Sequence, residues 1–510
     1  MSGSLFGLIR GRIPTAEQTL IETAAGKRIS YGEMLARSGR VAHALVQRGV
    51  KPGDRVAVQV EKSPENLMLF LATLRAGAVY LPLNTAYTIA ELDYFIGDAE
   101  PKLVVCDPAK RDGIAAIAHE HGAAVDTLDP LGRGSLVDLA ARSSPDFNDI
   151  ARTEEDLAAI LYTSGTTGRS KGATLTHRNL SSNADVLRSY WRFTATDMLL
   201  HALPLYHVHG LFTAAITLML AGGSMLFLPR FDAEEAIRLL PKATAMMGVP
   251  TYYTRLLQHP ALTRELCGHM RLFTCGSAPL LADTHREFFT RTGHAILERY
   301  GMTETGMNTS NPYDGERIPG TVGFPLPGVE LRIVDPETGA VLKQEEIGII
   351  EVRGPNVFAG YWRLPEKTAS EFRPDGFFIT GDVGKIDDRG YVHIVGRAKD
   401  LIISGGFNVY PKEVETEIDA LPGVIESAVI GCPHPDFGEA VTAVVVTEND
   451  AGLSEAAVIA ALEGRLAKFK LPKRVLFAPD LPRNTMGKVQ KNVLREANRD
   501  LYVSLRAHSG

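Results

Sequence analysis

The chain has 510 residues, more than a single hydrophobic core usually organises, so we expect at least two domains. Hydrophobic residues make up 45% and charged residues 22%, a balance typical of soluble globular proteins. The formal net charge is -6 and no basic stripe is present, which argues against a nucleic-acid-binding protein.

Neither the cysteines nor the apolar stretches indicate export or a membrane. Four cysteines occur without a C-x-x-C pair or a neighbouring histidine cluster: Cys106, Cys267, Cys275 and Cys432. A disulfide framework or structural zinc site is therefore not expected, and a reducing cytoplasm fits. The N-terminal apolar stretch is too short for a signal peptide, and the C-terminal AHSG carries no lipidation or peroxisomal signal. The longest apolar stretches, 67–81 and 211–228, contain polar or small residues and predict core elements rather than membrane spans.

Helix-like and strand-like stretches alternate through the first half of the chain. Residues 30–48 have helical spacing and end at Gly49, and a Pro-Gly-Asp turn follows. The same alternation continues with a helix at 66–75 and strands at 55–60, 78–81, 102–106, 157–161 and 223–228. This order predicts α/β architecture with largely parallel sheets.

The pattern changes after about Gly320. Short strands at 329–334, 348–353 and 391–395 predict a small β-rich subdomain. A compact αβ pattern then returns, with strands at 401–403, 426–430 and 440–447 and helices at 411–420 and 454–466. We place a boundary near Lys399, between an N-terminal domain, 1–398, and a small α+β C-terminal domain, 399–510. No internal repeat or low-complexity tract occurs.

The strongest local signal is a loop rich in glycines and hydroxyls, Tyr162–Gly172, which follows the apolar strand at 157–161. Glycines let a backbone approach a polyphosphate, hydroxyls and N–H groups donate to its oxygens, and Lys171 neutralises charge. A flexible surface loop is the plain alternative for GTTG alone. The spacing of a Walker A motif is not met, so a P-loop NTPase is disfavoured.

Four further motifs follow in order along the chain. They are Tyr300–Thr305 (YGMTET), Thr380–Asp382 (TGD), Gly396–Asp400 (GRAKD) followed by Ile403–Asn408 (ISGGFN), and Pro482–Lys488 (PRNTMGK). Together with the loop they resemble the motifs of the adenylate-forming superfamily, which includes acyl-CoA synthetases, peptide-synthetase adenylation domains and firefly-type luciferases. The resemblance spans nearly the whole chain. It implies that ATP activates a carboxylic acid as an acyl-adenylate and that coenzyme A then takes the acyl group.

The resemblance assigns most of these residues to ATP. The phosphates would meet Thr163, Ser164, Gly165, Thr166, Thr167, Gly168 and Lys171. Adenine and its surroundings would meet Gly276, Ser277, Ala278, Tyr300, Gly301 and Thr303, and the ribose would meet Asp382 and Arg397. Glu304 would hold Mg2+, a hard cation that suits carboxylate and phosphate oxygens. Taken singly, Glu304 could be a helix-start carboxylate, Tyr300 a core aromatic, and the Asp382 and Arg397 pair a surface ion pair.

The resemblance also implies two conformations in one catalytic cycle. Lys488 would stabilise the adenylation transition state, with Thr163, His207 and Glu304 as further catalytic residues, and would leave as the C-terminal domain rotates about the hinge residue Lys399. The loop along the CoA thiol channel would be Ser404, Gly405, Gly406 and Phe407. On its own, Lys488 is a solvated charge. Its glycine-bearing turn is also accessible for acetylation, which would make a lysine acetyltransferase and a deacetylase partners of this protein.

The acyl site is expected around His207, Ser277 and Met302. His207, in PLYHVHGL, matches the position between acyl pocket and pantetheine tunnel in the family, although a core histidine is the plain alternative. The chain looks most like the malonyl-CoA and methylmalonyl-CoA synthetases, which implies a small dicarboxylate substrate.

A second carboxylate needs a cation, and arginine suits it because its fork binds bidentately. Arg286, which follows the pocket wall at 276–280, is the first candidate. Its alternative reading is a solvated helix residue. Arg230 and Arg299 are weaker candidates.

Other functions remain open from the sequence. A short- or medium-chain acyl-CoA synthetase, or a stand-alone adenylation domain that loads a carrier protein, would use the same motifs, although no carrier domain is seen here. A luciferase-type monooxygenase has only the shared motifs in its favour. A non-catalytic nucleotide sensor could dispense with Lys488 and Glu304, and both are present.

Overall fold

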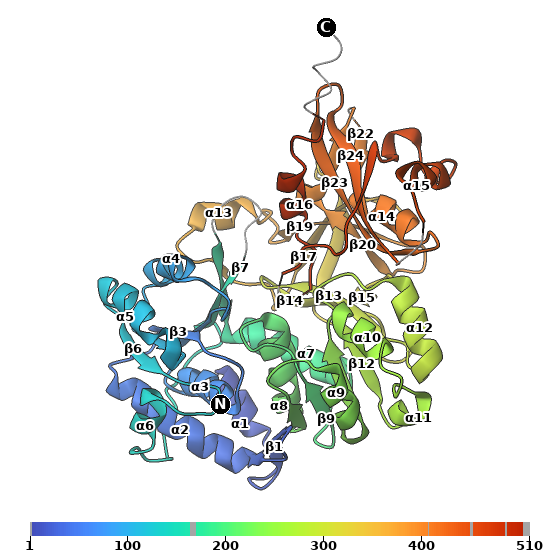
Figure 1. Ribbon diagram of the computed structural model, residues 1–510. Helices are drawn as coiled ribbons and strands as arrows, with labels where there is room; N and C mark the ends of the chain where they lie inside the picture. Colours follow the sequence, from blue (N-terminus) through green and yellow to red (C-terminus); the bar gives the residue numbers. More distant parts are fainter. Residues whose placement is uncertain (1–2, 164–169, 406, 449–451, 485–486, 503–510) are drawn as a thin grey trace. The chain divides into compact units, whose positions relative to one another are not determined.

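The computed structural model describes residues 3–163, 170–405, 407–448, 452–484 and 487–502. The chain forms two compact units, both visible in Figure 1. Unit 1 comprises Met1–Glu330 and Val352–Phe378, and unit 2 comprises Leu331–Glu351 and Ile379–Gly510. The chain thus crosses between units within the β-rich region expected after Gly320. This grouping does not locate a hinge, so the boundary near Lys399 stays a prediction.

One sheet of unit 1 is parallel in its middle and antiparallel at its edges. In spatial order its strands are β15 (Phe324–Pro325), β14 (Gly306–Ser310), β13 (Leu297–Met302), β12 (Leu272–Cys275), β11 (Ala245–Gly248), β9 (Met198–His201), β10 (Ser224–Phe227), β1 (Thr19–Thr23) and β2 (Arg28–Ser30). The strands from β13 to β1 run parallel, whereas β14, β15 and β2 pair antiparallel. Figure 1 shows α9, α10, α11 and α12 beside these strands, and side chains from both form one apolar cluster.

The second sheet of unit 1 carries the glycine- and hydroxyl-rich loop. In spatial order its strands are β18 (Gly360–Tyr361), β8 (Lys171–Thr176), β7 (Leu157–Thr163), β4 (Val79–Pro82), β3 (Arg55–Gln59), β5 (Leu103–Cys106) and β6 (Ala124–Thr127). The strands from β7 to β6 are parallel, while β8 turns back on β7 and β18 pairs antiparallel with β8. The loop therefore joins a buried parallel strand to the antiparallel edge of the sheet.

Several helices of unit 1, α2 among them, begin at a residue whose side chain caps the helix. The helices of this unit are α1 (Leu5–Gly11), α2 (Tyr31–Gln47), α3 (Pro64–Arg75), α4 (Ile89–Ala99), α5 (Arg111–Glu120), α6 (Ser135–Ala140), α7 (His177–Tyr190), α8 (Thr217–Ala221), α9 (Ala233–Leu239), α10 (Pro250–Leu257), α11 (Arg264–Cys267), α12 (Ala282–Thr292) and α13 (Pro365–Ser370). Short helical turns are η1 (Pro108–Lys110), η2 (His209–Ile216, a π-helix) and η3 (Leu240–Lys242). In α2, Ser30 and Glu33 form a capping box, and Gly49 with a φ of 80° follows the helix end.

Unit 2 contains two smaller sheets. One has the order β16 (Glu330–Val334), β17 (Gly348–Arg353), β19 (Phe378–Ile386) and β20 (Val392–Arg397). The other has the order β22 (Phe407–Val409), β21 (Ile402–Ser404), β24 (Gly438–Thr447) and β23 (Val424–His434), with β25 (Arg474–Phe477) beside β24. The helices are α14 (Pro411–Asp419), α15 (Glu455–Leu462) and α16 (Lys491–Ala497), with short turns η4 (Ala398–Asp400) and η5 (Lys468–Lys470).

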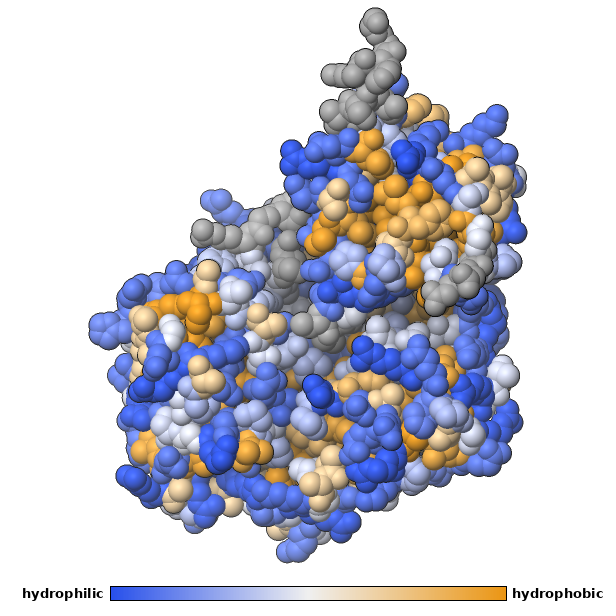
Figure 2. Space-filling model, viewed as in Figure 1, coloured by the Kyte–Doolittle hydropathy of each residue, from blue (hydrophilic) through white to orange (hydrophobic). Residues whose placement is uncertain are grey.

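Alternating residues of β23 and β24 pack on opposite faces of their sheet. Val429 and Val445 join the cluster under α14 and α15, whereas Ile430 and Val444 join the cluster under α16. Unit 2 also exposes large apolar side chains, and Figure 2 shows apolar surface gathered over this part of the chain. These exposed side chains are Val341, Ile403, Phe407, Ile425, Phe437, Phe477 and Val493.

The α/β prediction with parallel sheets, a β-rich part and an α+β C-terminal part is confirmed. One helix is shorter than predicted: α15 ends at Leu462 rather than 466, because Glu463 is extended and Gly464 has a φ of 83°. The apolar stretches at 67–81 and 211–228 lie in the core, apart from Ala221, which is only partly buried. Within the described ranges, every helix is too short or too polar to cross a membrane.

Candidate active site

Strands β7 and β8 form the hairpin that carries the expected phosphate loop. Their register pairs Thr163 at the end of β7 with Lys171 at the start of β8. Both residues are half-buried. The hairpin thus holds a hydroxyl and an ammonium group opposite each other at the base of the loop. Five further expected phosphate contacts lie outside the described residues: Ser164, Gly165, Thr166, Thr167 and Gly168.

A second hairpin, β13 to β14, carries the YGMTET motif. Tyr300 is half-buried near the end of β13. Gly301 lies so close to a backbone carbonyl of β14 that a Cβ would collide with it. Glu304 is only 6% exposed, and its carboxylate accepts a hydrogen bond from the Tyr361 hydroxyl at 3.1 Å. The motif therefore supplies an aromatic ring and a fixed carboxylate at the end of one strand.

The expected adenine wall, Gly276 to Ala278, follows β12 directly. Ser277 adopts a φ of 71°, which is costly for a residue other than glycine and is concentrated at functional sites. Its Oγ lies 3.1 Å from Nδ1 of His209. Gly276 has no side chain, and the guanidinium of Arg299 fills the space that a Cβ would occupy. The wall therefore contacts two buried polar side chains that were not its expected partners.

Arg299 is the most unusual charge in unit 1. It lies on β13, is 4% exposed, and its Nε and Nη2 have no hydrogen-bond partner among the described residues. The nearby groups that favour its charge are Cys275 and Tyr253. Burial lowers the pKa of Arg299 to about 10. At neutral pH it is thus a buried positive charge, and no described residue accepts a hydrogen bond from its Nε or Nη2.

Two buried histidines close to the charge of Arg299 are neutral at pH 7. Burial, followed by the charge of Arg299, lowers the pKa of His207 to about 4. Burial and Arg299 also hold the pKa of His209 well below its usual range. The Nδ1 of His207 accepts a hydrogen bond from the backbone N–H of His209 at 3.3 Å, and the Nε2 of His209 has no partner in the described chain. Arg299 is therefore the charged member of this group, and the two imidazoles are neutral polar groups near it.

Met302 and Thr303 continue from the same strand end. Both are half-buried, and Thr303 lines a small internal cavity of about 10 Å³ next to Asn183 and Asn356. Their position follows from β13, which also carries Arg299 and Tyr300. One strand thus supplies residues expected at the nucleotide and at the acyl group.

The other arginines considered from the sequence are exposed. Arg286 lies on α12, its side chain is 63% exposed, and it pairs with Asp283 one turn earlier. Arg230 follows β10 and is also exposed. An exposed guanidinium keeps its water and adds little to carboxylate binding. We therefore replace Arg286 with Arg299 as the candidate partner of a second carboxylate.

Unit 2 carries the expected ribose and hinge residues. Strands β19 and β20 pair Asp382 with Arg397, and Arg397 Nε lies 2.7 Å from an oxygen of Asp382, which is 3% exposed. Lys399 is exposed in η4, and its neighbour Asp400 pairs with Arg495 of α16 at 2.7 Å. An ion pair thus fixes the backbone on each side of the expected hinge residue.

Lys488 lies at the end of a turn that a hydrogen bond to the Asn484 side chain stabilises. The Asn484 side chain accepts from the Lys488 backbone N–H at 2.9 Å, and Gly487 has a φ of 76°. The residue as a whole is exposed, and the charged groups of unit 2 that act on its amine include Arg397 and Asp382. Desolvation of the amine, then the charge of Arg397, lowers the pKa of Lys488 to about 8. Its charge is therefore sensitive to pH in the range where enzymes are assayed.

The expected CoA loop lies between β21 and β22. Ser404 is buried, Gly405 has a φ of 57°, and Gly406 lies outside the described residues. Phe407 is 56% exposed and stacks on Phe469 at 4.7 Å. The loop thus presents an apolar ring at the surface of unit 2.

Three residues that the structure brings to these groups, His209, Tyr361 and Glu371, are not predicted from the motifs. His209 lies within PLYHVHGL, where its spacing indicates no role. Tyr361 and Glu371 lie some 200 positions from Lys171, yet both contact it or its neighbours. Only the pairing of β18 with β8 brings them together.

Known proteins are similar to this chain over nearly its whole length. The chain matches the AMP-binding enzyme family over residues 14–362 and the AMP-binding enzyme C-terminal domain over residues 413–488. A malonate–CoA ligase of Arabidopsis thaliana is 34% identical, over 97% of this chain and 89% of the relative. A feruloyl-CoA synthase of Amycolatopsis sp is 36% identical, over 92% and 94%.

Solved structures are similar over the same length. The crystal structure of ATP-bound MatB from Rhodopseudomonas palustris is 66% identical, with a TM-score of 0.97 over 98% of this chain and 100% of that one. A benzoate CoA ligase from Burkholderia xenovorans LB400 is 26% identical, with a TM-score of 0.87 over 96% and 99%. The resemblance drawn from the motifs is confirmed, and the chain belongs to the AMP-binding enzyme family as an AMP-forming acyl-CoA synthetase.

Proposed function

We propose that this enzyme activates a small dicarboxylate, malonate or methylmalonate, and joins it to coenzyme A. The observation that carries the proposal is Arg299, a buried guanidinium with two unused N–H groups that lies against Gly276 and whose charge acts on His207. A monocarboxylic acid would leave this charge without a partner. The second carboxylate of a dicarboxylate would meet it bidentately in a site with little water. Similarity to proteins named malonate–CoA ligase supports the same substrate.

The proposal assigns residues to the phosphates, the adenine and the ribose of ATP. Thr163 and Lys171 bind the β and γ phosphates, Tyr300 stacks on adenine, and Asp382 binds the ribose hydroxyls beside Arg397. These contacts fix the α-phosphorus so that the substrate carboxylate can attack it in line. His207 lies between the acyl group and the path of the CoA thiol. Because it is neutral, it can orient the acyl group without competing with Arg299 for its charge.

Glu304 is the proposed protein ligand of Mg2+. A single buried carboxylate fits this ion, since Mg2+ in ATP sites takes most of its ligands from phosphates and water. In the described residues, no group of three or more His, Cys, Asp or Glu forms a separate metal site. When bound, the ion neutralises the phosphate charge that develops as pyrophosphate leaves.

Lys488 supplies the remaining positive charge during adenylation and leaves when the C-terminal domain, 399–510, turns about Lys399. Ser404, Gly405, Gly406 and Phe407 would then border the CoA thiol. Acetylation of Lys488 by a lysine acetyltransferase, and its reversal by a deacetylase, would switch adenylation off and on. The cytoplasm, which supplies ATP and CoA, is the proposed compartment.

The test is an assay of AMP formation with ATP, Mg2+ and CoA over a series of acids. Malonate and methylmalonate should be preferred over acetate, succinate and fatty acids by at least tenfold in kcat/KM. Exchange of labelled pyrophosphate into ATP should require the acid but not CoA. Release of ADP and phosphate, or an equal preference for acetate and malonate, would contradict the proposal.

A further inference from the structure

The amine of Lys171 is held by a carboxylate of this chain. Lys171 Nζ lies 3.4 Å from Oε1 of Glu371 and 4.3 Å from the centre of the Tyr361 ring. The two charged side chains are 17% and 19% exposed, so water screens the pair only weakly. Glu371 directly follows helix α13. The lysine proposed to meet the ATP phosphates therefore has an internal anionic partner.

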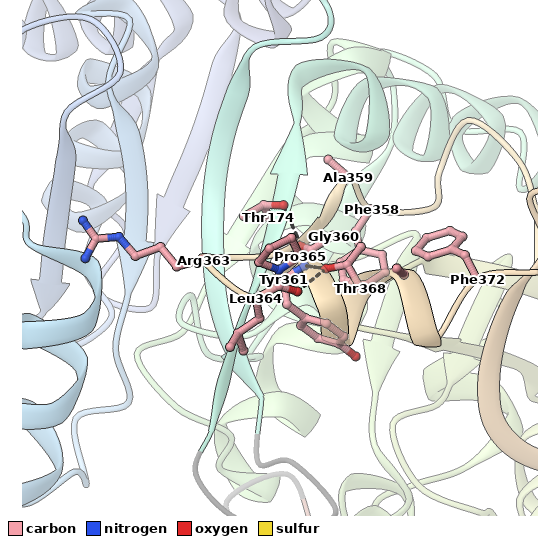
Figure 3. Close-up of a pocket in the computed structure, with 11 residues that line it drawn as sticks. Thr174, Phe358, Ala359, Gly360, Tyr361, Arg363, Leu364, Pro365, Thr368 and Phe372 are labelled. Carbon is pink, nitrogen blue, oxygen red and sulfur yellow. Dashed lines mark hydrogen bonds between the residues drawn. The ribbon is translucent and has the colours of Figure 1, made fainter.

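Tyr361 fixes the geometry of this pair. Strand β18 pairs Tyr361 with Ala173 of β8, two residues after Lys171, and the Tyr361 backbone N–H donates to Thr368 of α13 at 2.9 Å. Figure 3 shows the surface hollow, of about 650 Å³, that β18 and α13 border, with Tyr361 among its lining residues. The Tyr361 hydroxyl lies 2.8 Å from Glu371 and 3.1 Å from Glu304. Strand β8 and helix α13 are thus tied together at the residue that faces both carboxylates.

Glu371 has a second cation of its own. Lys367, one helical turn earlier, lies 2.6 Å from the same oxygen, Oε1, that faces Lys171. If Lys171 moves to a phosphate, Glu371 keeps both Lys367 and the hydrogen bond from Tyr361. Its carboxylate is then not left buried and unpaired, which would be the main cost of such an exchange. The Lys171 amine can therefore move from Glu371 to a phosphate and back at a modest cost in free energy.

We propose that Glu371 competes with the phosphates of ATP for the Lys171 amine, and that Lys367 weakens this competition by sharing the same carboxylate oxygen. The inference rests on the proposed role of Lys171 at the phosphates. It makes Glu371 and Lys367 determinants of nucleotide affinity that touch no substrate atom. The same competition favours departure of pyrophosphate, because Glu371 recaptures the amine as the phosphates leave.

Binding can be measured without chemistry by calorimetric titration with Mg2+ and α,β-methylene ATP, which cannot form an adenylate. Glu371→Gln keeps the size of the side chain and an acceptor for Tyr361 but removes the charge. It should tighten binding by about three- to tenfold, because the amine is released and a negative charge near the phosphates is lost. Lys367→Met should weaken binding by about two- to threefold, because Glu371 then holds Lys171 alone. In the double variant, the effect of Lys367→Met should disappear.

Glu366→Gln is the matched control, since Glu366 is an exposed carboxylate on the same helix. Its Kd should equal that of the parent, and thermal unfolding should confirm that all variants fold. An unchanged or weaker affinity of Glu371→Gln overturns the inference. A Lys367→Met effect that persists in the Glu371→Gln background also overturns it, because the effect is then a long-range charge effect. Lys171→Met distinguishes failure of the proposed role of Lys171 at the phosphates from failure of the competition with Glu371. If this variant leaves the Kd unchanged, the proposed role of Lys171 itself is wrong.

Discussion

Replacing Arg299 with methionine should make the protein more stable and the enzyme far less active on malonate. Methionine has a similar length and no charge, so it fills the space beside Gly276 without needing a partner. In the parent, burial lowers the pKa of Arg299 from 12.5 to about 10, which corresponds to about 3 kcal/mol against its charged form. Since the folded chain then binds the proton less tightly than the unfolded chain, this penalty applies fully below pH 10 and fades as the pH rises further.

Arg299→Met removes that penalty, and we expect a gain of about 1–2 kcal/mol in the free energy of unfolding at pH 7.5, after allowance for imperfect packing. Activity should change in the opposite direction. Losing one partner of a buried charge pair costs about 3 kcal/mol or more, a fall of at least 100-fold in kcat/KM for malonate. Acetate-dependent pyrophosphate exchange, which needs no second carboxylate, should not fall. The measurements are urea unfolding and pyrophosphate exchange with both acids.

The opposite signs distinguish a substrate-binding arginine from a structural one. If Arg299→Met loses stability, and exchange with acetate and malonate falls together, Arg299 supports the fold and the dicarboxylate proposal loses its main support. Arg286→Met is the control, since Arg286 is exposed. It should change stability by less than about 0.5 kcal/mol and leave malonate turnover unchanged.

Two further predictions concern Lys488. Lys488→Ala should nearly abolish adenylate formation but largely spare CoA transfer from supplied malonyl-adenylate. Chemical acetylation of the parent should have the same effect. A parallel loss of both half-reactions would refute rotation about Lys399. Pyrophosphate exchange should decline as the pH rises through about 8, because the lowered pKa of Lys488 removes its charge there. In Lys488→Arg that decline should move to higher pH, since a guanidinium keeps its proton, and an identical pH profile would exclude Lys488 as its cause.

The nucleotide residues could be predicted from the sequence because each motif is a short contiguous segment at the end of a strand. Tyr300 to Glu304 follow β13, Gly276 to Ala278 follow β12, and Thr163 with Lys171 flank one hairpin. Strands β12 and β13 are parallel neighbours, so the segments that follow them lie at the same edge of their sheet, while Thr163 and Lys171 face each other across a hairpin of the other sheet. Local sequence therefore already carries much of the geometry of each group. The roles of these residues at ATP remain predictions, but their grouping within each unit follows from strand order.

The acyl site could not be predicted in the same way, because its main charge is set by tertiary packing. Arg286 is near the pocket wall in sequence, but it lies on an amphipathic helix that buries His285 and Phe288 and exposes Arg286. Arg299 lies on β13, after the buried residues Leu297 and Glu298 and before the half-buried Tyr300. From the sequence alone, a charged residue in such a strand is easily taken to lie at the edge of the sheet. Only the three-dimensional contact with Gly276 shows that its guanidinium lies against the expected adenine wall.

Gly276 therefore links the nucleotide wall to the acyl pocket, and this leads to a last prediction. Gly276 does not have a positive φ, so alanine fits its backbone and any effect must come from the added methyl group. That methyl would collide with the guanidinium of Arg299 and displace it. Gly276→Ala should then reduce kcat/KM for malonate by about tenfold or more. In the Arg299→Met background the same change should have little further effect, because a flexible methionine can move aside. An equal loss in both backgrounds would mean that the methyl group acts on adenine alone, and the two halves of the site would then be independent.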